Sequence, residues 1–151
     1  MIPKPRPDIA EILPWQTADR VSNASFISLH LNENPYPPPP AVFDAIAQET
    51  MRNLRTFPDT GCTELVSAVA KSLAIHDDQV LFGAGSTELQ RCIMLAFAQQ
   101  YDKVGFLWPS SAYYMHLAKV HGCVPTPLYC LDFPEDEAIF NAPDDIKILF
   151  I

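Results

Sequence analysis

The sequence predicts an α/β fold with a mostly parallel sheet, flanking helices and a proline-rich N-terminal arm. Short apolar runs that suit buried strands alternate with longer segments in which apolar residues recur at helical spacing. Strands that alternate with helices form βαβ units, and such strands run parallel. Nine of the fifteen prolines lie in the first 40 residues. This bias divides the chain into an arm, residues 1–40, and an α/β region, residues 41–151.

The arm combines a candidate strand with a polar motif. The first prolines, at positions 3, 5, 7 and 14, disfavour regular structure, and residues 37–40 form a stiff polyproline stretch. Between them, residues 26–31 form a candidate strand, and residues 32–36 read Asn-Glu-Asn-Pro-Tyr. We expect the arm to lie on another surface and the polar motif to have a function. A loose tail is the alternative.

The α/β region is expected to alternate helices with strands. Helical spacing of apolar residues predicts helices at 41–54, 63–74, about 87–100 and 112–121. Apolar runs predict strands at 79–82, 103–108, 124–131 and 146–151. Pro125 and Pro127 make residues 124–131 an edge strand or an irregular one, because proline donates no ladder hydrogen bond.

The junction between residues 79–82 and the helix that follows has the features of an anion site. It reads Gly-Ala-Gly-Ser-Thr-Glu-Leu over residues 83–89. Glycines allow a sharp turn and a close approach to a ligand. Ser86 and Thr87 suit a helix N-cap, and free N–H groups at a helix start bind anions. A turn that needs glycine for its geometry alone explains the same residues equally well.

The junction does not match two common phosphate-binding motifs. No lysine follows the glycines, so it is not a P-loop. A dinucleotide-binding turn needs Gly or Ala at the sixth position, where this chain has Glu88. The next strand ends in Trp108-Pro109, without the acidic residue that would hold a ribose. A small ligand with a single phosphate fits better than a dinucleotide.

Composition excludes other classes of partner. The net charge of -8 argues against nucleic-acid binding, and no apolar run approaches the roughly 20 residues of a membrane span. The four cysteines form no C-x-x-C motif and the four histidines form no i, i+4 pair, so we assign no metal. Widely spaced cysteines fit reduced thiols in a cytoplasmic protein.

Four motifs in order resemble the pyridoxal-phosphate-dependent class I/II aminotransferases. They occupy residues 31–36, 55–59, 83–89 and 108–114. The branch with the greatest similarity is histidinol-phosphate aminotransferase, with its relative threonine-phosphate decarboxylase. The resemblance extends over residues 26–151 and matches the N-terminal part of that family's subunit. It implies an incomplete large domain of the aminotransferase fold type I, and a homodimer as the full-length form.

The resemblance also implies roles for particular residues. In the family, the loop that matches Gly85, Ser86 and Thr87 holds the phosphate of pyridoxal phosphate. The arm that matches Asn34 and Tyr36 lies near the amino substrate and the partner subunit. We therefore expect the first three residues to bind cofactor and the last two to bind substrate.

Two positions depart from the family pattern. Phe57 occupies the place of a tyrosine that reaches the partner subunit's cofactor phosphate, and it lacks the hydroxyl group. Ser111 occupies the place of an aromatic residue that stacks on the cofactor ring. We expect Ser111 and Tyr113 to lie on the ring side of the cofactor, with Tyr114 as the alternative to Tyr113.

The chain has none of the family's later motifs, which include the lysine that binds the cofactor covalently. Ligand sites in parallel sheets form at the carboxyl ends of strands, and the last predicted strand ends with the chain. We therefore expect a truncated aminotransferase that is inactive alone, and we assign no catalytic residue. The alternatives are a non-catalytic domain that binds a phosphorylated small molecule or a partner chain, and an α/β domain without a ligand.

Overall fold

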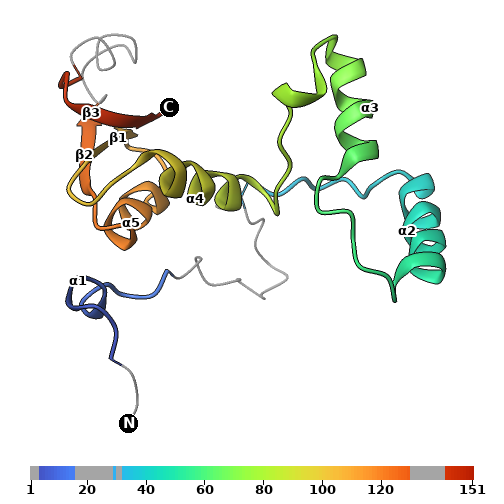
Figure 1. Ribbon diagram of the computed structural model, residues 1–151, viewed down its shortest axis with the longest axis horizontal. Coiled ribbons are helices and arrows are strands. Elements are labelled where there is room, and N and C mark those ends of the chain that lie inside the picture. The colour runs from blue at the N-terminus through green and yellow to red at the C-terminus, as the bar shows by residue number, and fades with distance from the viewer. Residues whose placement is uncertain (1–3, 16–28, 30–31, 130–141) are drawn as a thin grey trace. The chain divides into compact units, whose positions relative to one another are not determined.

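The computed structural model describes residues 4–15, 29, 32–129 and 142–151 of the chain (Figure 1). It divides into two compact units. The sheet unit comprises Met1–Gln16 with Phe82–Ile151, and the helical unit comprises Thr17–Leu81. The division expected at residue 40 reflects proline content rather than contacts, and it stays a prediction.

The sheet unit contains a parallel three-stranded sheet in the order β2-β1-β3. The strands are β1 (Lys103–Trp108), β2 (Val124–Tyr129) and β3 (Ile146–Phe150). Three of the predicted strands are therefore present, and the parallel α/β class is confirmed. β2 is an edge strand of the described sheet, as its two prolines require.

The strand predicted at residues 79–82 does not form. A 3₁₀ turn, η1 (Asp77–Gln79), occupies its start, and Val80 to Gly83 belong to no ladder. Val80 has the extended backbone of a strand, but no strand among the described residues pairs with it. An apolar run becomes a strand only where a neighbour accepts its hydrogen bonds. The other predicted strand, residues 26–31, lies outside the described residues except for Leu29.

The same unit contains three helices. They are α1 (Pro7–Ala10), α4 (Ser86–Phe97) and α5 (Tyr113–Val120). α4 and α5 begin within a residue of their predicted starts, whereas α1 was not expected among so many prolines. Pro7 is at the first helical position, where its missing N–H would have no helix partner anyway.

The core of the sheet unit lies where the helices meet β1. Met94 of α4, Val104 of β1 and Leu117 of α5 are almost completely buried in one cluster. The helical spacing of Leu89, Ile93, Ala96 and Phe97 predicts that these residues form the buried face of α4. This prediction is wrong in part, because Ile93 is 39% and Phe97 63% exposed. Both faces of this helix carry apolar side chains, and the described residues cover only the face of Met94.

The helical unit contains α2 (Pro40–Asn53) and α3 (Thr63–Leu73), which match the predicted segments closely. α2 has no buried residue, and Ala70 is the buried residue of α3. A hydrogen bond of 3.1 Å from Ser67 Oγ to Asp77 Oδ2 ties α3 to η1. The unit is therefore held mainly by local contacts.

We expect Phe106→Ala to lower the free energy of unfolding of this chain by about 3–5 kcal/mol. Phe106 is fully buried in β1, and its removal leaves a cavity beside Trp108 and Tyr114. The matched control is Leu95→Ala on α4, where the side chain is 75% exposed and the cost should stay within about 0.5 kcal/mol. Urea denaturation of both variants measures the difference, and equal costs would contradict this description of the core.

Candidate functional site

The glycine junction forms a tight turn at the start of α4. The Gly85 N–H donates to the Gly83 carbonyl oxygen at 2.7 Å. Gly85 is the N-cap, with φ 80° and ψ 173°, a conformation open almost only to glycine. Ser86 is thus the first residue inside the helix, and the expectation that Ser86 or Thr87 would be the cap is wrong. A side chain at position 85 would require a strained backbone.

The start of α4 offers hydrogen-bond donors to a ligand. A glycine N-cap has no side chain, and no side-chain cap is formed here. The first N–H groups of a helix have no partner within the helix, so those of Ser86, Thr87 and Glu88 point outward. A Cβ built on Gly85 meets nothing within 4 Å. The side chains of Ser86 and Thr87 are also exposed. Donors, hydroxyl groups and open space suit a phosphate group.

Glu88 shapes the same turn from inside the helix. Its Oε2 accepts a hydrogen bond from the Ala84 N–H. A Cβ on Gly83 would lie 2.9 Å from that oxygen and 2.9 Å from Leu89 Cδ2. A side chain at position 83 would therefore displace the side chains of Glu88 and Leu89, whereas Gly85 is required by backbone conformation. Geometry explains both glycines, and the uncapped, exposed donors are free to bind water or a ligand.

The topology places the turn at the carboxyl edge of the sheet. α4 packs on β1 through Met94 and Val104, and only residues 98–102 connect the two elements. A helix and a strand joined so closely must run in opposite directions, so the start of α4 lies near the end of β1. This is the edge where ligands bind in open α/β sheets. Gly85 to Thr87 and residues 109–113 therefore share one edge of the unit.

The residues expected beside the cofactor ring differ in their surroundings. Ser111 is exposed, and its Oγ accepts a hydrogen bond of 3.3 Å from the Tyr113 N–H. The half-buried Tyr113 ring meets Trp15 edge-on at 5.3 Å between ring centroids. Tyr114 instead stacks on Phe150 of β3 at 4.9 Å and 11°. Tyr114 is thus engaged by the sheet, and the ring-side roles of Ser111 and Tyr113 stay predictions.

Asn34 and Tyr36 belong to the helical unit. The Tyr36 N–H donates to Asn34 Oδ1 at 3.0 Å, so the amide side chain shapes the backbone of the motif. The Tyr36 side chain is 79% exposed and is available for contact with a ligand. Their expected substrate roles stay predictions.

The turn that contains Phe57 is shaped by Asp59. Its carboxylate accepts hydrogen bonds from the N–H groups of Gly61 at 2.9 Å and Thr63 at 2.7 Å. Bonds from the Thr63 backbone and side chain and from Gly61 lower the pKa of Asp59. Phe57 is 88% exposed and lines a hollow of about 1090 Å³ between α2 and α3. Asp59 therefore stabilises the start of α3, whereas the Phe57 ring is mostly exposed.

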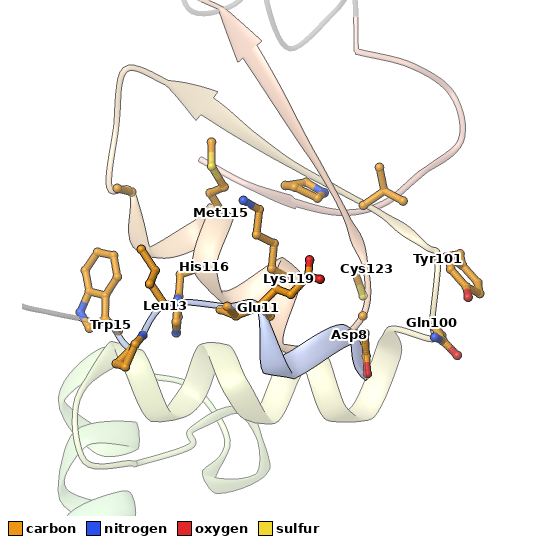
Figure 2. Close-up of a pocket in the computed structure, with 16 residues that line it drawn as sticks. Asp8, Glu11, Leu13, Trp15, Gln100, Tyr101, Met115, His116, Lys119 and Cys123 are labelled. Atoms are coloured by element: carbon orange, nitrogen blue, oxygen red, sulfur yellow. The ribbon is translucent and has the colours of Figure 1, made fainter. Parts of the chain in front are cut away.

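A cavity that the sequence did not indicate lies between the N-terminal segment and α5. Its volume is about 870 Å³, and its walls include Glu11, Trp15, Met115 and Lys119 (Figure 2). Gln100 and Gly122 mark its far end, at the edge of the sheet opposite the glycine turn. The one indication of this cavity in the sequence is the expectation that the arm, residues 1–40, lies on another surface.

In residues 4–15, 29, 32–129 and 142–151, no group of three or more His, Cys, Asp or Glu side chains is placed to hold a metal ion. No helix in the described part of the chain has both the length and the apolar character needed to cross a membrane.

The fold is that of the pyridoxal-phosphate aminotransferases. The structure superposes on alanine aminotransferase from Pyrococcus furiosus with a TM-score of 0.66, at 22% identity, over 76% of this chain and 32% of that one. It superposes on the α-aminoadipate aminotransferase LysN from Thermus thermophilus with a TM-score of 0.57, at 17% identity, over 72% of this chain and 30% of that one. The sheet unit is an incomplete large domain of fold type I.

The sequence then identifies the family. Residues 24–146 match the model of aminotransferase class I and II, and the chain belongs to this family. It is 36% identical to the histidinol-phosphate aminotransferase of Geotalea daltonii over 99 residues, which are 66% of this chain and 28% of that protein. The chain spans less than a third of the length of each of these three proteins.

We expect Gly85→Ala to destabilise the chain by about 1–3 kcal/mol, although the space around position 85 is open. The cost comes from the backbone conformation alone. Gly61→Ala is the matched control, because a Cβ there makes only ordinary contacts at 3.4 and 3.5 Å and the backbone φ is not positive. Thermal or urea unfolding of the two variants measures the costs, and a harmless Gly85→Ala would show that the turn is not held in this conformation.

We expect the stabilising effect of Asp59 to disappear in acid. Its folded-state pKa lies below its unfolded-state value. The effect is therefore complete above the unfolded-state pKa and is lost as pH falls through the folded-state pKa. The difference in unfolding free energy between wild type and Asp59→Asn should be constant near neutral pH and shrink over that acidic range. A difference that does not change with pH would contradict the capping role.

Proposed function

We propose that this chain is the N-terminal part of a pyridoxal-phosphate-dependent aminotransferase of the histidinol-phosphate type. The reaction transfers an amino group between an amino acid or amino phosphate and a 2-oxo acid. The observation that carries the proposal is the uncapped, glycine-led start of α4 at the carboxyl edge of the sheet. The similarity to histidinol-phosphate aminotransferase and the pyridoxyl compound in the solved LysN structure support it.

The residues present fit the phosphate of the cofactor. We propose that the N–H groups of Ser86 and Thr87 and their hydroxyls bind the phosphate, with Gly85 leaving room for it. Ser111 and Tyr113 would face the ring. When bound, pyridoxal phosphate withdraws electrons from the substrate's α-carbon so that a proton can leave. The chain's own residues contribute position and hydrogen-bond donors to that chemistry.

The helical unit contains the residues that we propose for contact with the substrate and with a partner chain. We propose that Asn34 holds the backbone of the arm and that Tyr36 contacts the amino substrate. We propose a second copy of the chain as partner, because α2 exposes Phe43, Ile46 and Met51. The cytoplasmic location expected from the cysteine pattern stays a prediction.

We propose that the 151-residue chain binds cofactor without completing the reaction. None of its five lysines lies in a sequence pattern like the family's cofactor-binding lysine, and Lys103 is paired with Asp145 at 2.6 Å.

A second function is favoured by Phe57 and Ser111, which lack the groups the family uses. On that alternative, the chain is a non-catalytic domain that binds a phosphorylated small molecule or a partner chain.

Replacing Ser86 and Thr87 together with leucine should weaken pyridoxal phosphate binding by at least about tenfold. Hydrogen bonds to a charged group contribute about 1.5–3 kcal/mol each, and about 1.4 kcal/mol corresponds to tenfold in affinity. Cys92→Leu is the matched control, because Cys92 is an exposed residue of α4 beyond its first turn. Titration followed by the absorbance of the cofactor gives both affinities.

The same titration separates the two functions. Pyridoxal phosphate should bind more tightly than inorganic phosphate, and phosphate should compete with it. Equal affinity for pyridoxal phosphate and for glycerol phosphate would favour the non-catalytic alternative. Unchanged affinity in the double leucine variant would place the site elsewhere.

A further inference from the structure

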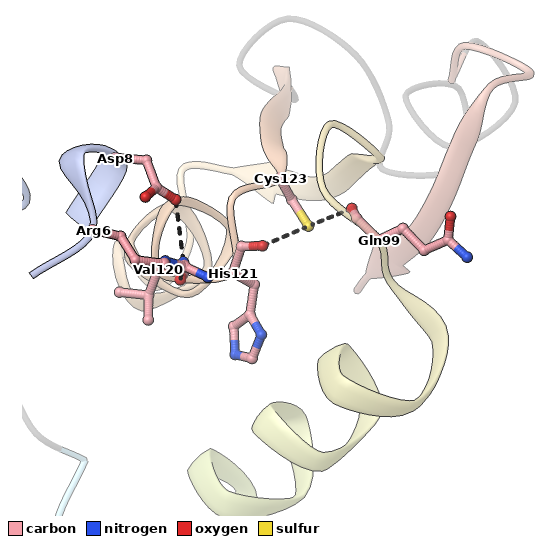
Figure 3. Close-up of polar contacts among 6 residues, drawn as sticks. All are labelled: Arg6, Asp8, Gln99, Val120, His121 and Cys123. Atoms are coloured by element: carbon pink, nitrogen blue, oxygen red, sulfur yellow. Dashed lines mark hydrogen bonds and ion pairs between the residues drawn. The ribbon is translucent and has the colours of Figure 1, made fainter.

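The N-terminal segment of the sheet unit lies across α5. We call residues 6–15 the N-terminal strap. They include α1 and run antiparallel to α5, since Arg6 meets the end of α5 and Trp15 meets its beginning (Figures 2 and 3). The strap thus contacts the helix at two anchors.

The first anchor is polar. Arg6 Nη2 donates to the Val120 carbonyl oxygen at 3.4 Å and pairs with Asp8 Oδ2 at 3.1 Å (Figure 3). A cation at the carboxyl end of a helix interacts favourably with its dipole. Burial, with the positive charges of Arg91 and Arg6, lowers the pKa of His121. Arg6 is therefore close enough to influence the end of α5.

The second anchor is aromatic. The Trp15 ring meets Tyr113 edge-on at 5.3 Å and 72°, and it lies 5.6 Å from the ring of His116. Trp15 is 43% exposed, so its contacts cover only part of its surface. Edge-to-face aromatic pairs contribute stability beyond the area they bury. Trp15 therefore contacts Tyr113, which is the first residue of α5.

The strap is weakly held between its anchors. α1 has only four residues and none of them is buried. The cavity of about 870 Å³ lies between the strap and α5, with Glu11 and Lys119 on its walls, and α1 contacts α5 beside it. A segment with few buried contacts opens more easily than the core does. Docking of the strap therefore depends on Arg6 and Trp15.

The Trp15 anchor reaches the candidate cofactor site through Tyr113. Tyr113 packs against the core cluster and also contacts Trp15. Its N–H also donates to Ser111 Oγ at 3.3 Å. Both residues follow β1 at the carboxyl edge. Trp15 thus restrains the ring expected to face the cofactor.

We propose that Trp15 is a positioning residue that holds Tyr113 in the orientation needed to contact the cofactor ring. The proposal rests on the proposed function, in which Tyr113 faces pyridoxal phosphate. A docked strap fixes the Tyr113 ring, and a released strap frees it. The phosphate-binding turn at Gly85 does not depend on the strap.

The test compares two ligands on the same chain. Trp15→Ala should weaken pyridoxal phosphate binding about 3- to 10-fold, in line with the loss of one aromatic pair. Binding of inorganic phosphate should be unchanged, because phosphate makes no ring contact. Trp15→Phe should restore most of the affinity. Leu13→Ala, an exposed position in the strap, is the matched control and should bind both ligands like wild type.

A double-mutant cycle shows whether Trp15 acts through Tyr113. Tyr113→Ala should mimic Trp15→Ala, and the double variant should bind no more weakly than Tyr113→Ala alone. Additive losses would overturn the proposal, as would equal losses of phosphate and pyridoxal phosphate binding in Trp15→Ala. Full pyridoxal phosphate affinity in Trp15→Ala would overturn this proposal alone. A wild-type chain that binds no pyridoxal phosphate would overturn the proposed function and this proposal with it.

Fluorescence tests the docking of the strap separately. The chain has two tryptophans, so Trp108→Phe leaves Trp15 as the single emitter. In that background, Arg6→Ala should shift the Trp15 emission to the red, because losing one anchor exposes the ring to water. Emission that is unchanged in Arg6→Ala would overturn the two-anchor strap.

Discussion

The sheet unit depends on the contact between two helices and the central strand. Met94 of α4 and Leu117 of α5 close over Val104 of β1, and all three are almost completely buried. This contact fixes the direction of α4 relative to β1, because a short connection joins them. It therefore brings the start of α4 to the carboxyl edge of the sheet. Without it the glycine turn would be a sequence motif with no fixed position.

The same contact decides what the glycine turn can do. A helix start becomes an anion site when its donors have no side-chain cap and space is open in front of them. Gly85 provides both conditions at once. The Glu88 carboxylate accepts a hydrogen bond from the Ala84 N–H and so holds the turn closed. The N–H groups at the start of α4 therefore keep their direction. The same residues therefore determine both the shape of the turn and its capacity to bind an anion. Neither property can be inferred from the presence of the two glycines alone.

Expectations from the sequence were most accurate where local pattern and tertiary packing agree. β1, α3 and α5 have nearly their predicted limits, because their apolar spacing is also what the core requires. They failed at residues 79–82, where no described strand pairs with an apolar run, and on α4, where both faces are apolar. Phe57 and Ser111 were recognised as departures from the family, yet their surroundings follow only from the structure.

The α/β class, most of the element order, the family and the residues of the glycine turn follow from the sequence alone. These features are local, since they depend on periodicity, on proline and glycine positions and on short motifs. Tertiary structure alone decided which face of α4 is buried, that Tyr114 stacks on Phe150, and that the strap reaches Tyr113 through Trp15. Trp15 and Tyr113 are nearly 100 residues apart. No local pattern encodes such a contact, because it exists only when the two segments pack together.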